Sequence, residues 1–232
     1  MFEFYKKHIP PSMKKQLFLL ATLFVVNILA QNNNTGTLYY KATVGYDDWF
    51  KSLPKEMQDN YKKDIEAQKH QLNFTPEAAN FQRITDMNYN ADSYYYTKAG
   101  DSVTQNYRND AQFGKLIILK NRLVNWKLGA ETKIIAGFEC YKAESEYEMK
   151  SGNKTIPIPL IAWYCPQIPA SFGPFGYGGL PGMILEFQER NVVYGVYQMD
   201  FTNHAPTIKI PKEGKKIDEA SYHKMIQQRY SK

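Results

Sequence analysis

The chain lacks the sequence patterns that mark the common enzyme classes. It contains no Gly-x-Ser-x-Gly, His-Glu-x-x-His or Cys-x-x-Cys pattern, and no glycine-rich phosphate-binding loop follows a predicted strand. Histidine is also scarce, with four in 232 residues, although a nucleophilic serine or cysteine usually needs a histidine as its base. His70 and His223 fall in polar stretches that favour helices, so we expect both to be solvated. The sequence therefore predicts no catalytic residue, no metal site and no cofactor.

Positive charge is in excess but is not clustered. The formal net charge is +6, and residues 1–30 contribute four lysines and one glutamate, so the remaining chain carries +3. A nucleic-acid-binding domain would gather lysine and arginine on one face or along one helix. We therefore expect no nucleic-acid partner.

The chain also lacks an apolar run of the length that a membrane-spanning helix needs, which is about 20 residues. Its longest run, residues 17–30, is interrupted by Thr22 and Asn27. Lys14 and Lys15 precede this run, and polar residues follow it at once. A basic start, a short apolar segment and a small residue at the junction are typical of a secretory signal peptide. An uncleaved anchor and a short buried helix are the alternatives.

This signal sets the predicted domain boundaries and the predicted location. We expect residues 1–30 to be the signal peptide, with its conventional start at Met13, and residues 31–36 to be a polar leader. Residues 37–216 then form a single β-rich domain, and residues 217–232 form a C-terminal helix. The mature chain would have no integral membrane span and would lie in the periplasm or outside the cell.

Short segments rich in β-branched and aromatic residues dominate the rest of the chain. Strands are predicted at residues 37–46, 93–97, 102–107, 115–119, 123–128, 132–148, 155–165, 183–188 and 192–201, and helices at 49–71 and 218–229. Residues 72–84, around Thr75-Pro76, are predicted as a bent strand or a strand–turn. Successive strands with short connections indicate a mainly antiparallel sheet, and the few helices make the fold class α+β. A sheet of this kind, with one helix after the first strand and one at the C-terminus, can curl into an open half-barrel.

The two cysteines belong to one predicted hairpin. If residues 152–153 form a two-residue turn, counting outward in register places Cys140 opposite Cys165. The pair is of the non-hydrogen-bonded kind, in which Cα atoms approach to about 4.5 Å, within the range of about 4.4–6.8 Å that a disulfide needs. Pro157 and Pro159 lack amide hydrogens, so a bulge there would shift the register by one. A disulfide is favoured in an oxidising compartment, and two buried thiols are the alternative.

The second half of the chain carries a series of short motifs. They are Gly137-Phe138-Glu139-Cys140, Ala162-Trp163-Tyr164, Ile168-Pro169 and, most specifically, Gly179-Leu180-Pro181-Gly182-Met183-Ile184. Over residues 105–190 the chain resembles the GLPGLI family, exported proteins of Bacteroidetes named for the last hexapeptide, with Met183 in place of the family's leucine. The resemblance implies a signal peptide, a β-rich fold and a Bacteroidetes source, and it implies no catalytic residue. Cys140 matches the family motif, whereas Cys165 stands where the family more often has a hydroxyl residue.

The loop at residues 166–182 is dense in proline and glycine and is the candidate binding site. Glycine adopts backbone angles that other residues avoid, and proline fixes its own φ, so the loop should be rigid. It either reverses the chain and closes one end of the sheet with its rings, or offers rings and backbone groups to a ligand or partner. The candidate residues are Trp163, Tyr164, Pro174, Phe175, Tyr177, Gly179, Leu180, Pro181 and Gly182.

These observations favour a non-catalytic exported protein of the cell envelope that binds an apolar ligand or a protein partner. An apolar ligand would lie in the hollow of a curled sheet, lined by residues such as Ile118, Trp126 and Ile184. As an alternative, the loop at 166–182 would dock the protein onto an outer-membrane protein. A third hypothesis is an enzyme whose site no motif reveals.

Overall fold

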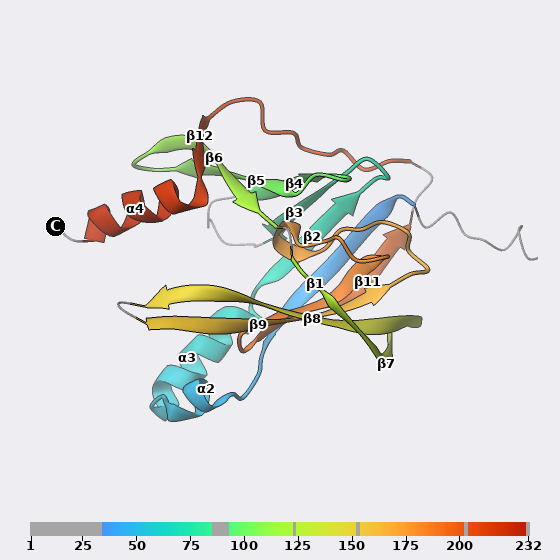
Figure 1. Ribbon diagram of the computed structural model, residues 1–232, viewed down its shortest axis with the longest axis horizontal. Coiled ribbons are helices and arrows are strands. Elements are labelled where there is room, and N and C mark those ends of the chain that lie inside the picture. The colour runs from blue at the N-terminus through green and yellow to red at the C-terminus, as the bar shows by residue number, and fades with distance from the viewer. Residues whose placement is uncertain (1–33, 85–92, 123, 152–153, 202–203, 231–232) are drawn as a thin grey trace, which may run out of the picture. The chain divides into compact units, whose positions relative to one another are not determined.

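The computed structural model describes residues 34–84, 93–122, 124–151, 154–201 and 204–230. The predicted signal peptide and residues 31–33 of the predicted polar leader lie outside the described residues. The described residues form one twelve-stranded sheet in the order β12-β6-β5-β4-β3-β2-β1-β11-β10-β9-β8-β7 (Figure 1). Neighbouring strands pair antiparallel, except that β12 pairs parallel with β6.

The elements follow one another along the chain with short connections. They are β1 (Gly36–Val44), α2 (Asp48–Ser52), α3 (Lys55–Glu66), β2 (Lys69–Phe74), β3 (Ala78–Ile84), β4 (Tyr94–Lys98), β5 (Val103–Asp110), β6 (Gly114–Asn121), β7 (Lys127–Ile135), β8 (Phe138–Ser151), β9 (Lys154–Cys165), the 3-10 turn η1 (Pro174–Gly176), β10 (Met183–Glu189), β11 (Val192–Phe201), β12 (Lys215–Asp218) and α4 (Glu219–Tyr230).

The predicted half-barrel with one helix after the first strand is wrong. The sheet is open, with β12 and β7 as its edges. Two helices follow β1, because Asp47 begins α2 by accepting the amide hydrogen of Phe50 at 2.8 Å, and Pro54 then separates α2 from α3. The predicted continuation of the helix to residue 71 is replaced by β2, in which His70, Leu72 and other alternate residues are buried.

Two predicted strand segments are each a hairpin: residues 72–84, predicted as a bent strand or a strand–turn, and residues 132–148, predicted as one strand. Residues 72–84 turn at Thr75, whose Oγ1 accepts the amide hydrogens of Glu77 and Ala78, at 3.3 Å each. Residues 132–148 turn at Ala136-Gly137, where both φ angles are positive, at 49° and 88°. Glycine takes such angles readily but alanine does so rarely, so the dipeptide is a weak turn signal in the sequence.

The register predicted for the cysteine hairpin is confirmed. β8 and β9 pair without a shift over eleven consecutive residue pairs, and the next step brings Cys140 opposite Cys165. Pro157 and Pro159 cause no bulge, because β10 covers β9 only from Leu160 onward and leaves that edge of β9 without a paired strand. Both cysteines are fully buried, and the structure has them as free thiols.

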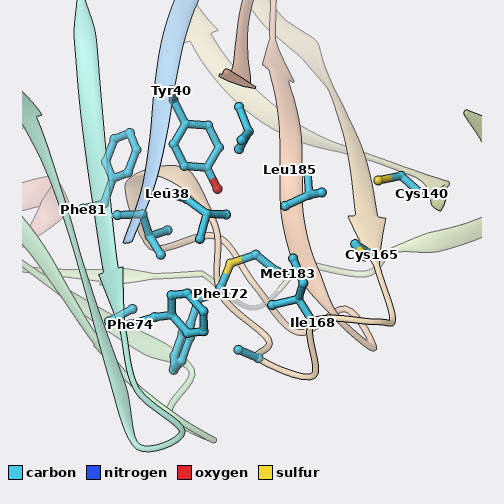
Figure 2. Packing of buried hydrophobic residues seen from close by; sticks show 14 residues of the cluster. Leu38, Tyr40, Phe74, Phe81, Cys140, Cys165, Ile168, Phe172, Met183 and Leu185 are labelled. Atoms are coloured by element: carbon cyan, nitrogen blue, oxygen red, sulfur yellow. The ribbon is translucent and has the colours of Figure 1, made fainter. Parts of the chain in front are cut away.

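The larger core cluster lies on the face of the sheet that carries Leu38, Leu72, Phe81 and Tyr95, which is called the inner face from here on. These four residues are cross-strand neighbours from β1 to β4. Figure 2 shows the cluster they help to form, with Met183 and other residues of β10 and the preceding loop packed against β1 and β2. Each large apolar side chain fully buried in this way stabilises the fold by about 1.5–3 kcal/mol.

The loop at 166–182 folds onto the inner face. Thr104 Oγ1 on β5 donates to the carbonyl oxygen of Gly176 at 3.1 Å. Trp126 Nε1, just before β7, donates to the carbonyl oxygen of Gly178 at 2.9 Å. Residues far apart in the sequence therefore fix the middle of the loop, and its rings point into the protein.

Gly176→Ala and Gly179→Ala separate steric crowding from backbone strain in this loop, because both glycines have a φ of 80°. A Cβ at Gly176 would lie 2.3 Å from the Thr104 side chain, whereas one at Gly179 would meet nothing within 4 Å. We expect Gly179→Ala to lower the free energy of unfolding by about 1–2 kcal/mol, the cost of a left-handed alanine. We expect Gly176→Ala to lower it by about 1–3 kcal/mol more through overpacking. Urea denaturation measures both, and equal losses would contradict close packing of the loop on β5.

Candidate functional site

A cavity of about 350 Å³ lies on the inner face, beside the η1 turn. Its walls come from four successive strands, β2 to β5, from Ser93 just before β4, and from Phe175 of the loop. The lining residues are His70, Phe81, Gln82, Arg83, Ser93, Tyr95, Arg108, Asn109, Asp110 and Phe175, and the cavity is called the His70 pocket from here on. None of the residues expected to line an apolar hollow, such as Ile118, is among them.

Aromatic rings form one wall of the pocket. The His70 imidazole stacks on Phe81, with ring centres 5.1 Å apart and planes 7° from parallel. Phe175 packs edge-on against Phe81, Tyr95 and Tyr194, at 4.8, 5.6 and 4.7 Å. Phe175 has a φ of 57°, a conformation that costs a non-glycine residue about 1–2 kcal/mol, so its packing must offset that strain.

Two polar atoms of the pocket residues are buried without a partner. His70 is 3% exposed, and its Nδ1 has no hydrogen-bond partner among the described residues; the same holds for Nε of Arg108. Leaving a buried donor or acceptor unpaired costs about 1–3 kcal/mol. Two such atoms around one cavity are a destabilising arrangement that a bound ligand could relieve.

The pocket holds a neutral imidazole among charged neighbours. Burial, with a smaller contribution from the Arg83 charge, lowers the pKa of His70 to about 4, so the ring is uncharged at pH 7. The Asp110 carboxylate accepts the amide hydrogens of Gln112 and Phe113 at 2.8 and 2.9 Å, and these bonds lower its pKa. Two guanidinium groups and one carboxylate leave the lining with a net positive charge.

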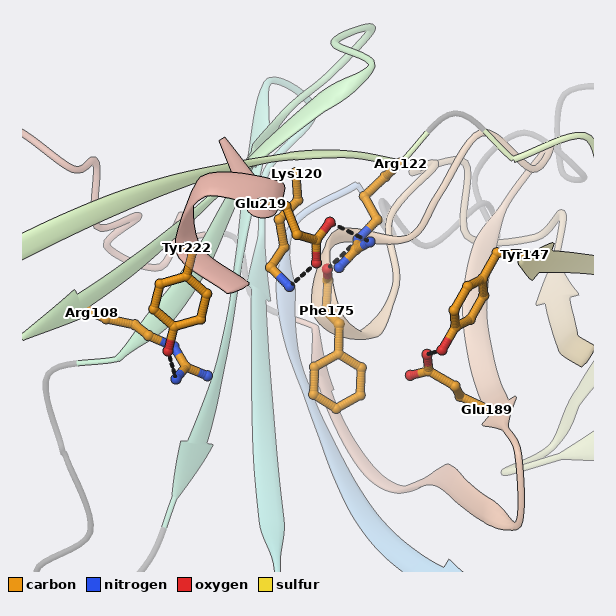
Figure 3. A network of polar contacts seen from close by, with 8 residues as sticks. All are labelled: Arg108, Lys120, Arg122, Tyr147, Phe175, Glu189, Glu219 and Tyr222. Carbon is orange, nitrogen blue, oxygen red and sulfur yellow. Dashed lines mark hydrogen bonds and ion pairs between the residues drawn. The ribbon is translucent and has the colours of Figure 1, made fainter. Parts of the chain in front are cut away.

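The C-terminal helix reaches the pocket on two sides through a network of polar contacts (Figure 3). Tyr222 on α4 accepts a hydrogen bond from Nη1 of Arg108 at 2.9 Å. Glu219, also on α4, pairs with Lys120 at 2.5 Å and with Arg122 at 3.9 Å. Arg122 in turn donates through Nε to the Phe175 carbonyl oxygen at 3.4 Å. Helix α4 therefore supports both the cationic and the aromatic wall.

Of the residues predicted for binding, the structure brings Phe175 into the pocket. The others lie mostly inside the protein: Tyr164, Pro174, Tyr177, Leu180 and Gly182 are buried, Trp163 is half-buried, and Gly179 and Pro181 are exposed. The Tyr177 ring stacks near Phe187 at 4.5 Å, with the Arg122 guanidinium 4.7 Å above it. The Lys133 ammonium lies 4.2 Å above the Trp163 ring. The described loop residues therefore present no contiguous aromatic patch.

Sequence reasoning missed His70, which was expected to be solvated at the end of a helix. The available signal was the alternation His70-x-Leu72-x-Phe74, a strand pattern that the polar residues between them obscured. Nothing in the sequence distinguishes Arg108 from the other arginines, because its neighbours come from β2, β3 and α4.

The cysteine pair packs in the larger core cluster with Ile168 and Met183, away from the residues that line the His70 pocket (Figure 2). Cys140 Sγ donates to the Phe138 carbonyl oxygen at 3.6 Å. The neighbouring Cys140 thiol, with the amides of Gln167 and Ile168, lowers the pKa of Cys165 despite burial. The Cys165 thiol and burial raise the pKa of Cys140. Each thiol therefore influences the ionisation of the other.

Comparison with known proteins matches one segment of the chain to a family of unknown function and shows a likeness of fold to a solved structure. A family described as "Protein of unknown function (Porph_ging)" matches residues 144–186, which include the loop that carries Phe175. A solved structure of PNGF-II is similar over 84% of this chain at 12% sequence identity, with a TM-score of 0.54. The chain spans 33% of the length of that protein, and the likeness is one of fold alone. No curated protein matches the chain.

The described residues contain no cluster of three or more histidine, cysteine, aspartate or glutamate residues that could hold a metal ion. None of their helices has both the length and the apolar character to cross a membrane.

The lowered pKa of His70 predicts a specific loss of stability in acid. The unfolded histidine, with a pKa of about 6.5, binds a proton more readily than the folded one, so stability is full above pH 6.5 and falls as the pH drops toward 4. From pH 7 to pH 5 we expect wild type to lose about 2 kcal/mol more than His70→Phe, in which the acidic residues are unchanged. Urea denaturation at both pH values measures the difference. An equal loss in both proteins would contradict a buried neutral imidazole.

Proposed function

We propose that this chain is a non-catalytic binding protein of the cell envelope that holds a small ligand in the His70 pocket. The pocket volume of about 350 Å³ is at the lower end of the range for small-molecule sites. Its lining combines rings with guanidinium groups. This combination suits a ligand with both a planar carbon framework and polar groups better than the purely apolar ligand that the sequence favoured.

The observation that carries the proposal is the buried Nδ1 of His70, which has no hydrogen-bond partner in the part of the chain that the structure describes. A phenylalanine at this position would keep the stacking on Phe81 and remove the cost of the unpaired atom. The presence of a histidine that lowers stability is best explained if its Nδ1 forms a hydrogen bond with a ligand that enters the cavity.

Binding fits the surroundings of His70 better than catalysis does. A catalytic histidine is usually oriented by a carboxylate and placed beside a nucleophile. The recorded ring contacts of His70 are with Phe81, Phe175 and Tyr194. These rings hold the imidazole rigidly and keep it neutral, which suits a fixed hydrogen-bonding group.

The probe for this proposal is 4-hydroxybenzoate, a single ring with a hydroxyl and a carboxylate. Titration of the folded protein, followed by the ring signals of its histidines in ¹H–¹³C NMR spectra, should shift His70 and leave His204 and His223 in place. We expect His70→Phe to bind the probe at least about tenfold more weakly, the value of one good hydrogen bond to a charged ligand, without losing thermal stability.

The matched control is His204→Phe, which removes an exposed histidine outside the pocket lining and should leave the affinity unchanged. His70 signals that stay fixed at high probe concentration would sink the proposal. A His70→Phe protein with lower stability and unchanged affinity would assign the histidine a purely structural role.

We also propose that the chain is exported to the periplasm or beyond and that Cys140 and Cys165 are oxidised there. The basic and apolar segments before Ala30 support export. The register that places the two buried cysteines opposite each other supports a disulfide. The two thiols would lose two protons and two electrons to a disulfide oxidant of that compartment, forming one S–S bond and two oxidant thiols.

Intact-mass spectrometry of protein isolated from the cell envelope tests both points. We expect a chain that begins at Gln31 and is lighter by two hydrogen atoms than the same chain after reduction. Cys140→Ser should restore the mass expected for an unbridged chain. Two thiols that react with N-ethylmaleimide in the unfolded, unreduced protein would overturn the disulfide, and an intact N-terminus would overturn signal cleavage.

A further inference from the structure

We infer that the ligand of the His70 pocket carries a planar anionic group such as a carboxylate, that Arg108 binds this group, and that Tyr222 is the residue that positions Arg108. This inference rests on the proposed binding function and specifies its ligand class.

The hydrogen bonding of Arg108 leaves one edge of its guanidinium available. Nη1 donates to the Tyr222 hydroxyl at 2.9 Å, whereas Nε, on the opposite side of the group, has no partner among the described residues. Nε and Nη2 together present two parallel donors, the arrangement that accepts both oxygens of a carboxylate. Arg108 is a lining residue of the pocket, so an anion placed there would pair with a donor that is otherwise buried and unpaired.

The charges around the pocket favour an anion over a cation. Arg83 and Arg108 both line it, against the single carboxylate of Asp110. That carboxylate is bound by two backbone amides of the β5–β6 turn, so its negative charge is already compensated locally. The His70 ring is uncharged at neutral pH and adds a hydrogen-bonding group without adding charge.

Tyr222 restricts Arg108 in two ways. Its hydroxyl accepts the Nη1 hydrogen bond, and the guanidinium lies 5.5 Å from the centre of its ring. Tyr222 is itself held in the first turn of α4, where Asp218 accepts the Ser221 amide hydrogen at 2.7 Å and Glu219 pairs with Lys120. A side chain with this support loses less conformational entropy when it binds an anion.

The test compares 4-hydroxybenzoate with 4-hydroxybenzamide, which has nearly the same shape and no charge, by calorimetry and by the His70 NMR signals. In wild type we expect the benzoate to bind at least about tenfold more tightly. Arg108→Met should make the two affinities equal. Tyr222→Phe should reduce the preference for the benzoate several-fold while leaving benzamide binding unchanged, an effect that general loosening of the structure would not produce.

The charge-matched control is Lys41→Met, which removes an exposed cation of β1 and should keep the wild-type preference. Equal affinities of both probes for wild type, with His70 still shifting, would overturn the anionic ligand and leave the binding function intact. An unchanged preference in Tyr222→Phe would overturn the positioning role alone. Failure of both probes to shift His70 would instead overturn the proposed function.

Discussion

The packing of Phe175 on the inner face is the contact on which the rest of the site depends. Its ring touches rings of β2, β3, β4 and β11, strands that are distant in the sequence, and it does so from a backbone conformation that is unfavourable for phenylalanine. Neighbouring glycines let the chain approach the sheet closely enough for this contact, since Gly176 leaves no room for a Cβ beside Thr104. The loop is therefore both part of the core and one wall of the pocket, which ties the site's geometry to the stability of the fold.

The interior of this protein is not organised for stability alone. The strands around the pocket could have buried apolar side chains at the positions of His70 and Arg108, as they do at Leu72 and Phe81 on the same face. Instead two polar groups lie there, each with one buried atom that finds no hydrogen-bond partner among the described residues, at a cost of about 1–3 kcal/mol each. Polar residues that weaken a core are expected at functional sites. Here both such residues, His70 and Arg108, line the same cavity.

The sequence was most informative where a local rule determined the structure. A two-residue turn and strict alternation were enough to place Cys140 opposite Cys165, because hairpin register follows from the turn. Helix prediction failed after α3, since a polar composition concealed the two-residue alternation of β2. The openness of the sheet and the pairing of β12 with β6 depend on contacts between distant segments, for which a single sequence gives no signal. The pocket is harder still to foresee, because it exists only when four strands and a loop meet.

The C-terminal helix α4 takes part both in the packing of the fold and in the support of the pocket. Helix α4 follows a strand of four residues, and its main recorded polar links to the sheet are those of Glu219 and Tyr222. Lys120 and Arg122, the partners of Glu219, are only 14% and 15% exposed, so these ion pairs are shielded from water and are stronger than surface pairs. The same links fix Arg108 and the carbonyl of Phe175. If a ligand binds Arg108, ligand binding and the packing of α4 on the sheet must be thermodynamically coupled. Linkage requires each of the two to favour the other by the same free energy. The size of this coupling is limited by the contacts that join α4 to the pocket, namely the direct bond of Tyr222 with Arg108 and the indirect link of Glu219 to Phe175 through Arg122.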